Sequence, residues 1–377
     1  MSQSTTLFSG MEVHKEAIAV ASGAQDHGAE GTSLGSLGTR RQCASAQRIG
    51  KMLAKANHLS LIYEAGPCGS GLYRSLMTQG DDCGVVAPSL IPQTPGDRVT
   101  TDRRDAVQLA RLARAGALTA VYGPRGDEEA RRDLTRARED ALSDLKDAQL
   151  RLKAFWRRHD LRYVGRAPWG PAHLRWLSEV SCPPPAQPMV VQEYVRAVRA
   201  HHEHRQRLAP ARHAHGHTWR LSPVVEALQA RRGVPCTVAG TLGAAMGDLT
   251  RGESPRERMT FLGLMPSAHS SGAKRRQGAM PKAGNRHARR GLVEGAWASR
   301  SPAKGSRPRQ LRREQPPKVS QDIRWQAQVR LGKRDRRLVA RGTQAKVVPV
   351  AMARALTGFL WAMAQEVPIA VEDHNDA

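Results

Sequence analysis

The chain has 377 residues, enough for two or three domains, and its formal net charge of +25 points to a polyanionic partner, with nucleic acid as the first choice. Five scattered cysteines without a C-x-x-C pair argue against a disulfide framework or a zinc site, and an aromatic content of 4% argues against rows of stacking platforms for single strands. Without a signal-peptide pattern or an apolar stretch approaching the length of a spanning helix, the sequence predicts a cytoplasmic protein with no membrane partner.

The first elements of the chain are predicted to be two antiparallel strands. Residues 8–13 and 17–21 are short apolar runs on either side of His14-Lys15-Glu16, as in a tight hairpin. On the first strand Glu12 and His14 share one face, because side chains alternate along a strand. An edge strand with a wet face is the ordinary alternative. A third strand within residues 23–39 rests on analogy alone.

The next segments alternate between helix and strand. We expect helices at residues 46–56 and 72–78, a buried strand at 59–63 that ends on Glu64, and a strand at 83–87 followed by a Pro-rich loop at 88–96. Glu64 would therefore lie at the carboxyl end of a strand, where open α/β sheets place their chemistry. The alternation predicts an α/β layered domain.

Asp102 and Asp105 stand three residues apart at the start of a predicted helix. The apolar residues Leu109, Leu112 and Ala113 continue the same stripe, so both carboxylates are expected to point inward. A preceding threonine, Thr100 or Thr101, is suited to cap the helix, whose positive end keeps carboxylates ionised for a hard cation such as Mg²⁺. An ordinary acidic first turn is the alternative.

The pattern becomes helical after residue 124. Residues 128–159 and 190–208 predict two long amphipathic helices across a Pro-rich break at 182–185, as a helical hairpin or an inter-subunit coiled coil. From Leu221 a helix, the turn 231–235 and a second helix to Met246 resemble a helix-hairpin-helix binder of the phosphate backbone.

A pair of hydroxyls follows, between an apolar element and what we expect to be a flexible basic loop. Ser271 with Gly272, or Ser270 in its place, is a candidate nucleophile towards phosphorus, with neighbouring cations to stabilise the phosphoryl oxygens. A loop that only binds phosphate is the alternative.

Basic residues are concentrated in the last third of the chain. Residues 273–342 hold 21 Lys and Arg against 4 Asp and Glu, a nucleic-acid footprint. We expect helices at 282–300, 321–340 and 347–365, with a disordered basic linker at 302–318. The candidate nucleic-acid contacts are Lys274, Arg275, Arg276, Lys282, Asn285, Arg289 and Arg290.

Together these segments resemble the transposases of insertion sequence family 110, which combine an N-terminal acidic tetrad with a C-terminal serine domain. The residues that carry the resemblance are MEVHKE at 11–16, YEAG at 63–66, TDRRDA at 101–106, LGL at 262–264 with Pro266, SSG at 270–272, and Lys282 with Gly284-Asn285.

The resemblance implies four domains. They are an RNase H-like, Holliday-resolvase-like α/β domain at 1–124, a helical connector or coiled coil at 125–215, a mostly α serine transposase domain at 216–300, and a basic linker with C-terminal helices at 301–377. It implies that Glu12, Glu64, Asp102 and Asp105 hold Mg²⁺ and that Ser271 forms a covalent link to DNA. DNA, an element-encoded guide RNA and further copies of the chain in a dimer or tetramer would be its partners, with the protein associated with the nucleoid.

Two departures from the family pattern accompany the match. The first acidic position is normally Asp, whereas this chain has Glu12, and Met280-Pro281 precede Lys282. Two other functions therefore compete with recombination. One is a metal-dependent resolvase-type nuclease in which Ser271 only binds phosphate, and the other is a catalytically inactive, nucleic-acid-binding transposase remnant.

Overall fold

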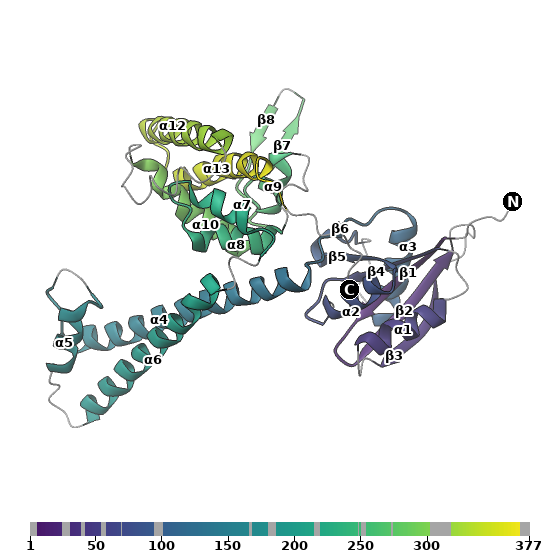
Figure 1. The fold of residues 1–377 in the computed structure, drawn as a ribbon, viewed down its shortest axis with the longest axis horizontal. Coiled ribbons are helices and arrows are strands. Elements are labelled where there is room, and N and C mark those ends of the chain that lie inside the picture. Colours follow the sequence, from purple (N-terminus) through teal and green to yellow (C-terminus); the bar gives the residue numbers. More distant parts are fainter. Residues whose placement is uncertain are drawn as a thin grey trace. The chain divides into compact units, whose positions relative to one another are not determined.

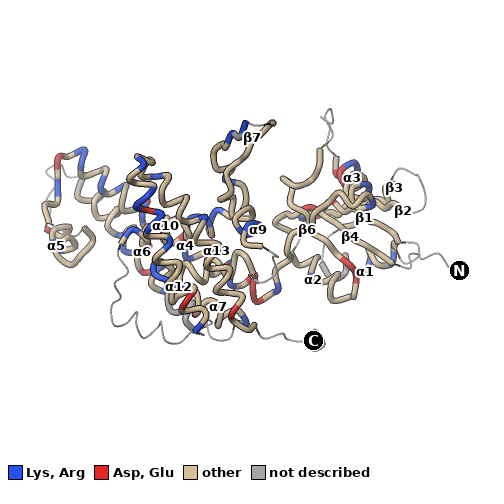
Figure 2. Tube along the Cα trace, turned by 90° about the horizontal axis from the view of Figure 1, so that it is seen from above, with Lys and Arg blue, Asp and Glu red and all other residues tan. Residues whose placement is uncertain are grey.

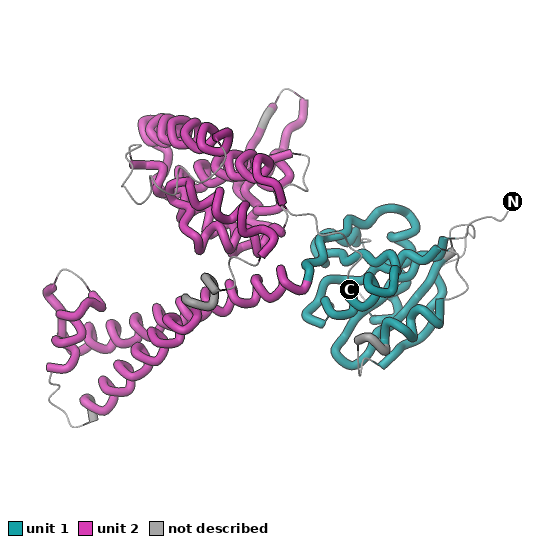
Figure 3. Tube along the Cα trace, viewed as in Figure 1, with its two compact units in different colours: residues 1–125 teal, residues 126–377 magenta. Residues whose placement is uncertain are grey.

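A computed structural model describes the protein from residue 6 to residue 369. Residues 25–30, 39–41, 54–57, 69, 94–100, 166–167, 180–185, 215–218, 248, 250–253, 273 and 302–317 lie outside the description. The chain divides into two compact units, residues 1–125 and 126–377 (Figure 3). The basic linker expected at 302–318 falls almost wholly outside the described residues, and the four-part division of the chain stays a prediction.

The first unit is built on one mixed sheet of six strands. The strands are β1 (Thr6–Val13), β2 (Ala17–Ala24), β3 (Thr32–Gly38), β4 (His58–Glu64), β5 (Asp82–Val86) and β6 (Ala120–Val121). Their order in the sheet is β3-β2-β1-β4-β5-β6. Strands β1, β4 and β5 are parallel, whereas β2, β3 and β6 pair antiparallel with their neighbours. The mixed α/β class expected for this part of the chain is confirmed.

Helices cover both faces of this sheet (Figure 1). On one face the buried side chain of Met11 packs in a core with α1 (Gln42–Leu53) and α2 (Ser70–Thr78). On the other face, Ala19 and Ala21 of β2 pack against Ala106 of α3 (Asp102–Arg114). Because side chains alternate along β1, Gly10 and Glu12 face α3 while Met11 faces α1 and α2.

The second unit begins with a long helical hairpin. Helix α4 (Gly126–Arg158) packs along α6 (Ala186–Ala214), with the short helix α5 (Pro171–Glu179) beside the end of the pair (Figure 1). Leu145 and Leu152 of α4 and Val198 of α6 are buried in their contact. The two predicted amphipathic helices and their packing are confirmed, and they lie within one chain.

The rest of the second unit is a helical core with one small hairpin. Its elements are α7 (Ser222–Gln229), α8 (Cys236–Met246), α9 (Pro255–Phe261), β7 (Ala268–Ser271), β8 (Lys274–Gln277), α10 (Arg286–Trp297), α12 (Lys318–Ala340) and α13 (Val347–Gln365). The helix expected from residue 282 begins at Arg286 instead, because Lys282 and Gly284 have φ angles of 60° and 81°, outside the helical range. Asn285 then caps α10 by accepting a hydrogen bond from the Ala288 amide at 3.0 Å.

Helix α13 corrects one expectation drawn from the sequence. Its 19 residues are long enough and apolar enough to cross a membrane by length and composition, although the sequence seemed to lack such a stretch. In the structure Met352, Leu356 and Met363 of this helix are fully buried in the core of the second unit. Burial on this scale is what the central helix of a helical core shows.

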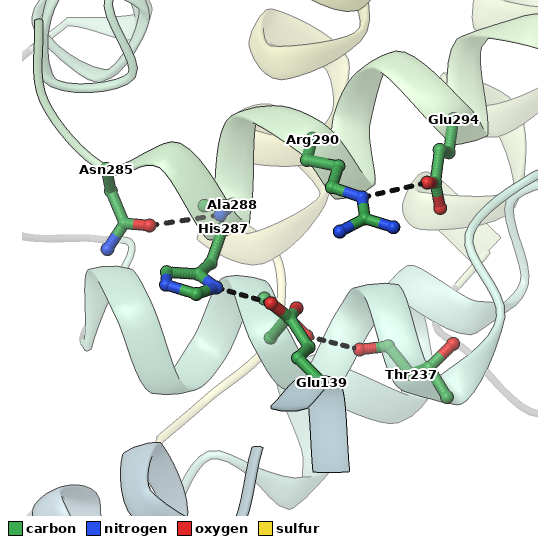
Figure 4. A network of polar contacts seen from close by, with 8 residues as sticks. Glu139, Thr237, Asn285, His287, Ala288, Arg290 and Glu294 are labelled. Carbon is green, nitrogen blue, oxygen red and sulfur yellow. Dashed lines mark hydrogen bonds and ion pairs between the residues drawn. The ribbon is translucent and has the colours of Figure 1, made fainter. Parts of the chain in front are cut away.

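Polar contacts attach α4 to that core. Glu128 is completely buried and pairs with Arg220 at 2.7 Å. Arg132 donates from Nε to the carbonyl oxygen of Ala244 at 2.6 Å, at the end of α8. Further along α4, Glu139 pairs with His287 of α10 (Figure 4). The first turns of α4 are thus part of the core, and its distal half forms the hairpin.

Candidate active site

Glu12 and Glu64 occupy neighbouring strands at the same edge of the sheet. Glu64 is the last residue of β4, and Glu12 lies one residue before the end of β1. The two strands are parallel, with Met11 opposite Tyr63, so the glutamates follow that pair at the carboxyl ends of both strands. The position expected for Glu64 from the sequence is confirmed.

Asp102 and Asp105 occupy the first turn of α3. Thr101 is the cap residue, and its hydroxyl accepts a hydrogen bond from the Arg104 amide at 3.4 Å. Asp105 is partly buried, whereas the side chain of Asp102 is 60% exposed. Asp102 is thus mostly exposed, although its carboxylate lies 3.2 Å from His14, which follows β1.

A close approach of backbones brings α3 to β1. A Cβ atom placed on Gly10 would lie 2.2 Å from the Ala106 carbonyl oxygen and 2.5 Å from the Ala110 nitrogen. No side chain fits in that space, so only glycine lets the helix lie this close to the strand. Gly10 stands two residues before Glu12 on the same face of β1, and it thereby fixes how near the first turn of α3 comes to Glu12. Gly10 did not stand out in the sequence.

His14 is a further residue of this region that sequence reasoning noted only for its face. Its Nε2 lies 3.2 Å from a carboxylate oxygen of Asp102 and 3.7 Å from one of Glu12. The imidazole thus lies between the acidic residue of β1 and that of α3. The sequence indicated that Glu12 and His14 share a face of the strand. It did not show that α3 covers this face, so it did not identify His14 as a neighbour of Asp102.

Burial and mutual repulsion shape the electrostatics of these groups. Burial raises the pKa of Glu12 above its usual value, the negative charge of Glu64 raises it further, His14 opposes the rise, and the two aspartates add to it. Burial also raises the pKa of Asp105, with Asp102 adding to the effect. Glu12 therefore feels all three other carboxylates, which makes the four residues one electrostatic cluster, here called the acidic cluster.

The acidic cluster has the donor chemistry that Mg²⁺ requires. All four side chains offer carboxylate oxygens, the ligands that hard cations prefer, and a cation among them would relieve the repulsion that raises the pKa of Glu12. Within the described part of the chain, however, no three His, Cys, Asp or Glu side chains are grouped tightly enough to hold a metal ion. The residues fit the ion in kind, and binding requires them to draw closer together.

The candidate serines lie on a β-hairpin, not beside a loop. Ser270 and Ser271 end β7, and the basic residues expected in a flexible loop form β8, with Ser271 opposite Lys274. Gly272 follows in the turn with a φ angle of 56°, a conformation that favours glycine. Both serines are exposed, and because they are adjacent on a strand their side chains point to opposite faces of the hairpin.

The pairing of the strands assigns neighbours to each serine. Residues directly opposite each other share a face, so Ser271 lies on the face that carries Lys274, His269 and Arg276, with His269 opposite Arg276. Ser270 lies on the other face with Arg275, whose backbone alone is described. His269 is therefore a possible proton acceptor for Ser271 that sequence reasoning missed, because it becomes a neighbour only in a strand.

Two candidate nucleic-acid contacts are engaged inside the protein. Asn285 caps α10 (Figure 4), and Arg289 donates from one guanidinium nitrogen to the carbonyl oxygens of Leu262 and Ala283, both at 2.9 Å. The strands β7 and β8 form a hairpin, here called the serine hairpin. The Arg289 contact joins Leu262, which precedes this hairpin, to Ala283, which follows it. These two side chains hold the base of the hairpin in place.

The other candidates remain at the surface. Lys274, Arg276 and Lys282 are exposed, and Arg290 forms a solvent-exposed pair with Glu294 at 3.1 Å. Exposed ion pairs of this kind contribute little to the stability of the fold, so Arg290 can exchange Glu294 for a phosphate group. Lys and Arg recur along the β7–β8 hairpin and along the helices of the second unit (Figure 2). This unit thus offers cations beside Ser271.

Comparison with known proteins gives two kinds of match. Residues 225–310, which include the serine hairpin, match the family described as Transposase IS116/IS110/IS902. The chain is 44% identical over 318 residues, 84% of its length and 78% of the relative, to a protein named "Putative transposase y4qE" from Sinorhizobium fredii (strain NBRC 101917 / NGR234). It is 32% identical over 181 residues, 46% of its length and 50% of the relative, to the transposase for insertion sequence element IS1533 from Leptospira borgpetersenii.

Proposed function

The chain belongs to the IS116/IS110/IS902 transposase family, and from this membership we propose that it excises and inserts a mobile element by Mg²⁺-dependent DNA strand cleavage through a phosphoserine intermediate. The observation that carries the proposal is the acidic cluster. Glu12 and Glu64 lie at the carboxyl ends of neighbouring parallel strands, and the close approach at Gly10 brings the helix that begins with Asp102 and Asp105 against the same face of β1. Ordinary capping of α3 does not account for the two glutamates.

The strand order supports an RNase H-like assignment for the first unit. Its sheet has β1 in the centre, an antiparallel meander through β2 and β3 on one side, and the parallel strands β4 and β5 on the other. Glu12, Glu64, Asp102 and Asp105 would hold the metal at the edge of this sheet. Bound Mg²⁺ would supply Lewis acidity and neutralise charge on the oxygens of the scissile phosphate.

Ser271 would act as the nucleophile. Its Oγ forms a bond to phosphorus while the bond to the bridging oxygen of the leaving strand breaks, and that oxygen takes up a proton. The proton of the Ser271 hydroxyl passes to His269 on the same face, and Lys274 and Arg276 stabilise the charged phosphoryl oxygens. The phosphoserine ester keeps the energy of the phosphodiester, so a DNA hydroxyl can later displace the serine without ATP.

The proposed partners follow from the charge and from the family. The net charge of +25 supports binding of DNA and of an element-encoded guide RNA, both of which are polyanions. Assembly into a dimer or tetramer and association with the nucleoid belong to the same proposal. Mg²⁺ is the one metal that the proposal requires.

The test compares three variants of the full chain on nicked and intact DNA of the element end in Mg²⁺. Ser271→Ala should abolish a covalent protein–DNA adduct, while Ser270→Ala, the matched control on the opposite face, should retain it. Asp105→Asn should abolish strand cleavage and leave binding intact, because an amide is a poor ligand for Mg²⁺. Denaturing electrophoresis followed by mass spectrometry of the linked peptide measures the adduct and identifies its residue.

Each outcome separates the competing functions. Metal-dependent cleavage without any adduct would establish the nuclease instead, with Ser271 as a phosphate ligand. Binding without cleavage in the wild-type chain would establish the inactive remnant. An adduct that survives Ser271→Ala, or that maps to a tyrosine, would refute the serine mechanism.

A further inference from the structure

The distal end of the helical hairpin contains a cavity of about 380 Å³. Its walls come from the last turns of α4, the segment that follows, and α5, and they include Leu152, Trp156, Tyr163, Trp169, His173 and Leu177. Sites for small molecules typically have volumes of roughly 300–1,000 Å³ and mostly apolar walls. A packed interior leaves few voids larger than a water molecule, so this cavity, here called the tip pocket, is more than imperfect packing.

Aromatic rings are concentrated around the tip pocket. Trp, Tyr and Phe make up 4% of the whole chain, yet several of them gather here. The ring centroids of Trp156 and Trp176 lie 4.2 Å apart, and those of Tyr163 and Trp169 lie 4.6 and 4.9 Å from the ring of His173. Aromatic rings are the surfaces on which nucleobases stack.

Two polar atoms in the walls are buried without a partner. His173 is 7% exposed, and neither its Nδ1 nor the Nε1 of Trp156 has a hydrogen-bond partner. Buried polar atoms are almost always paired, so a ligand with polar edges that reached these two atoms would supply the partners that they lack. Burial lowers the pKa of His173, which favours the neutral ring with one nitrogen that donates and one that accepts. A nucleobase edge presents both kinds of partner.

Charges at the rim decide between ligand classes. Lys153, Arg157 and Arg162 line the pocket and are exposed, and Arg162 forms a solvent-exposed pair with Asp160 at 3.2 Å. Such a rim repels a cationic ligand, including the methylated amines that aromatic cages otherwise bind. It suits a flat ring that carries phosphates on either side.

We propose that the tip pocket receives one unstacked nucleobase of a single-stranded segment of the bound nucleic acid, with the flanking phosphates on Lys153 and Arg157. This inference rests on the proposed action on nucleic acid. The helical hairpin of α4 and α6 would then recognise nucleic acid at its end as well as act as a spacer. Its end would select nucleic acid with an unpaired base and would disregard uninterrupted duplex, whose bases are stacked and paired.

The experiment measures affinity of the full chain for three fluorescein-labelled probes, which are a single-stranded RNA of mixed sequence, DNA of the same sequence, and the corresponding DNA duplex. Trp169→Ala removes a stacking wall, and His173→Phe removes the unpaired Nδ1 of that residue while keeping a ring. Trp325→Ala on α12, where the tryptophan is 56% exposed and away from the pocket, is the control. Thermal melting by circular dichroism checks that each variant folds.

The proposal expects both pocket variants to weaken single-strand binding about fivefold or more while duplex affinity and the control stay unchanged. The single strand that loses more affinity, RNA or DNA, identifies the source of the base. Equal losses on duplex and single strands, or no loss on either, would overturn the tip pocket as a base site. Duplex binding without any single-strand binding by the wild-type chain would overturn this inference alone. Absence of binding to all three probes would overturn the proposed function as well.

Discussion

Replacing Gly10 with alanine should damage the acidic cluster without touching a carboxylate. The added Cβ would lie 2.2 Å from the carbonyl oxygen of Ala106, so α3 must move until that distance reaches at least the 3.4 Å of ordinary contact, a shift of about 1.2 Å. Overpacking of this kind costs about 1–3 kcal/mol. A displacement of about 1 Å in reacting groups lowers rates by roughly a hundredfold, and we expect that loss in Mg²⁺-dependent cleavage.

The assay must report on the first unit by itself. All seven tryptophans follow residue 155, so their emission reports only the second unit. Hydrogen exchange of peptides from β1 and α3, followed by mass spectrometry, measures the local loss of stability. Gly50→Ala is the matched control, because Gly50 lies within α1 with nothing within 4 Å of an added Cβ, and alanine there should stabilise the helix by about 0.5–1 kcal/mol.

Two results would refute this reasoning. Unchanged exchange of β1 and α3 in Gly10→Ala would mean that the helix does not lie against the strand as closely as described. Weakened protection with normal cleavage would mean that the position of α3 does not set the geometry of the acidic cluster.

Two further predictions concern the cluster and the basic surface. Glu12→Asp, which restores the shorter carboxylate normal in the family, should raise cleavage, whereas Glu12→Gln should remove it; equal activity in all three forms would exclude Glu12 as a ligand. The logarithm of duplex affinity should fall linearly with the logarithm of salt concentration, and Lys274→Gln with Arg276→Gln should lessen that slope by roughly two. Arg289→Gln should instead destabilise the second unit by about 1–3 kcal/mol, since two carbonyl oxygens lose their donor, and a lessened slope without loss of stability would contradict that structural role.

Most elements of the first unit were predictable from a local pattern, whereas β3 was expected only by analogy and β6 was not predicted. The strand that ends on Glu64 is rich in Leu, Ile and Tyr, and the helix at Asp102 has a threonine cap. The sequence also placed Glu64 at the carboxyl end of its strand, whereas the meeting of Glu64 with Glu12 was implied only by the family resemblance. It did not predict that Asp102 is mostly exposed, because exposure depends on tertiary packing around the first turn of α3.

The serine region was harder to predict because its structure depends on contacts distant in the sequence. The segment that contains Lys274 and Arg276 lacks the alternation of apolar and polar residues that predicts a strand. A short two-stranded hairpin also has only marginal stability by itself. Asn285 and Arg289 looked like nucleic-acid contacts because they are polar and lie in a basic stretch. Their use in fixing the hairpin base appears only once the carbonyl oxygens of Leu262 and Ala283 are brought together.

The tip pocket could not be predicted either, because it also depends on contacts between residues distant in the sequence, whereas composition is an average over the whole chain. An aromatic content of 4% argues against many stacking platforms along a groove, but it says nothing against one site at which several rings gather. Trp156 and Trp176 belong to different helices and meet only because α5 folds back on the end of α4. Tertiary contacts alone create that surface.

The acidic cluster depends on two residues of opposite size on one face of β1. Gly10 is small enough to admit the backbone of α3, and Glu12, two residues further, is long enough to reach towards the first turn of that helix, where His14 bridges the gap to Asp102. Burial raises the pKa of Glu12 most, and the charge of Asp105 adds to that rise. A shorter aspartate at position 12 would leave more room beside Asp105 and weaken this repulsion, but only if α3 stays in place. The effect of Glu12→Asp is therefore conditional on Gly10. In a double-mutant cycle, the gain from aspartate should vanish in the Gly10→Ala background, and a gain that persisted there would show that the strand and helix set their carboxylates independently.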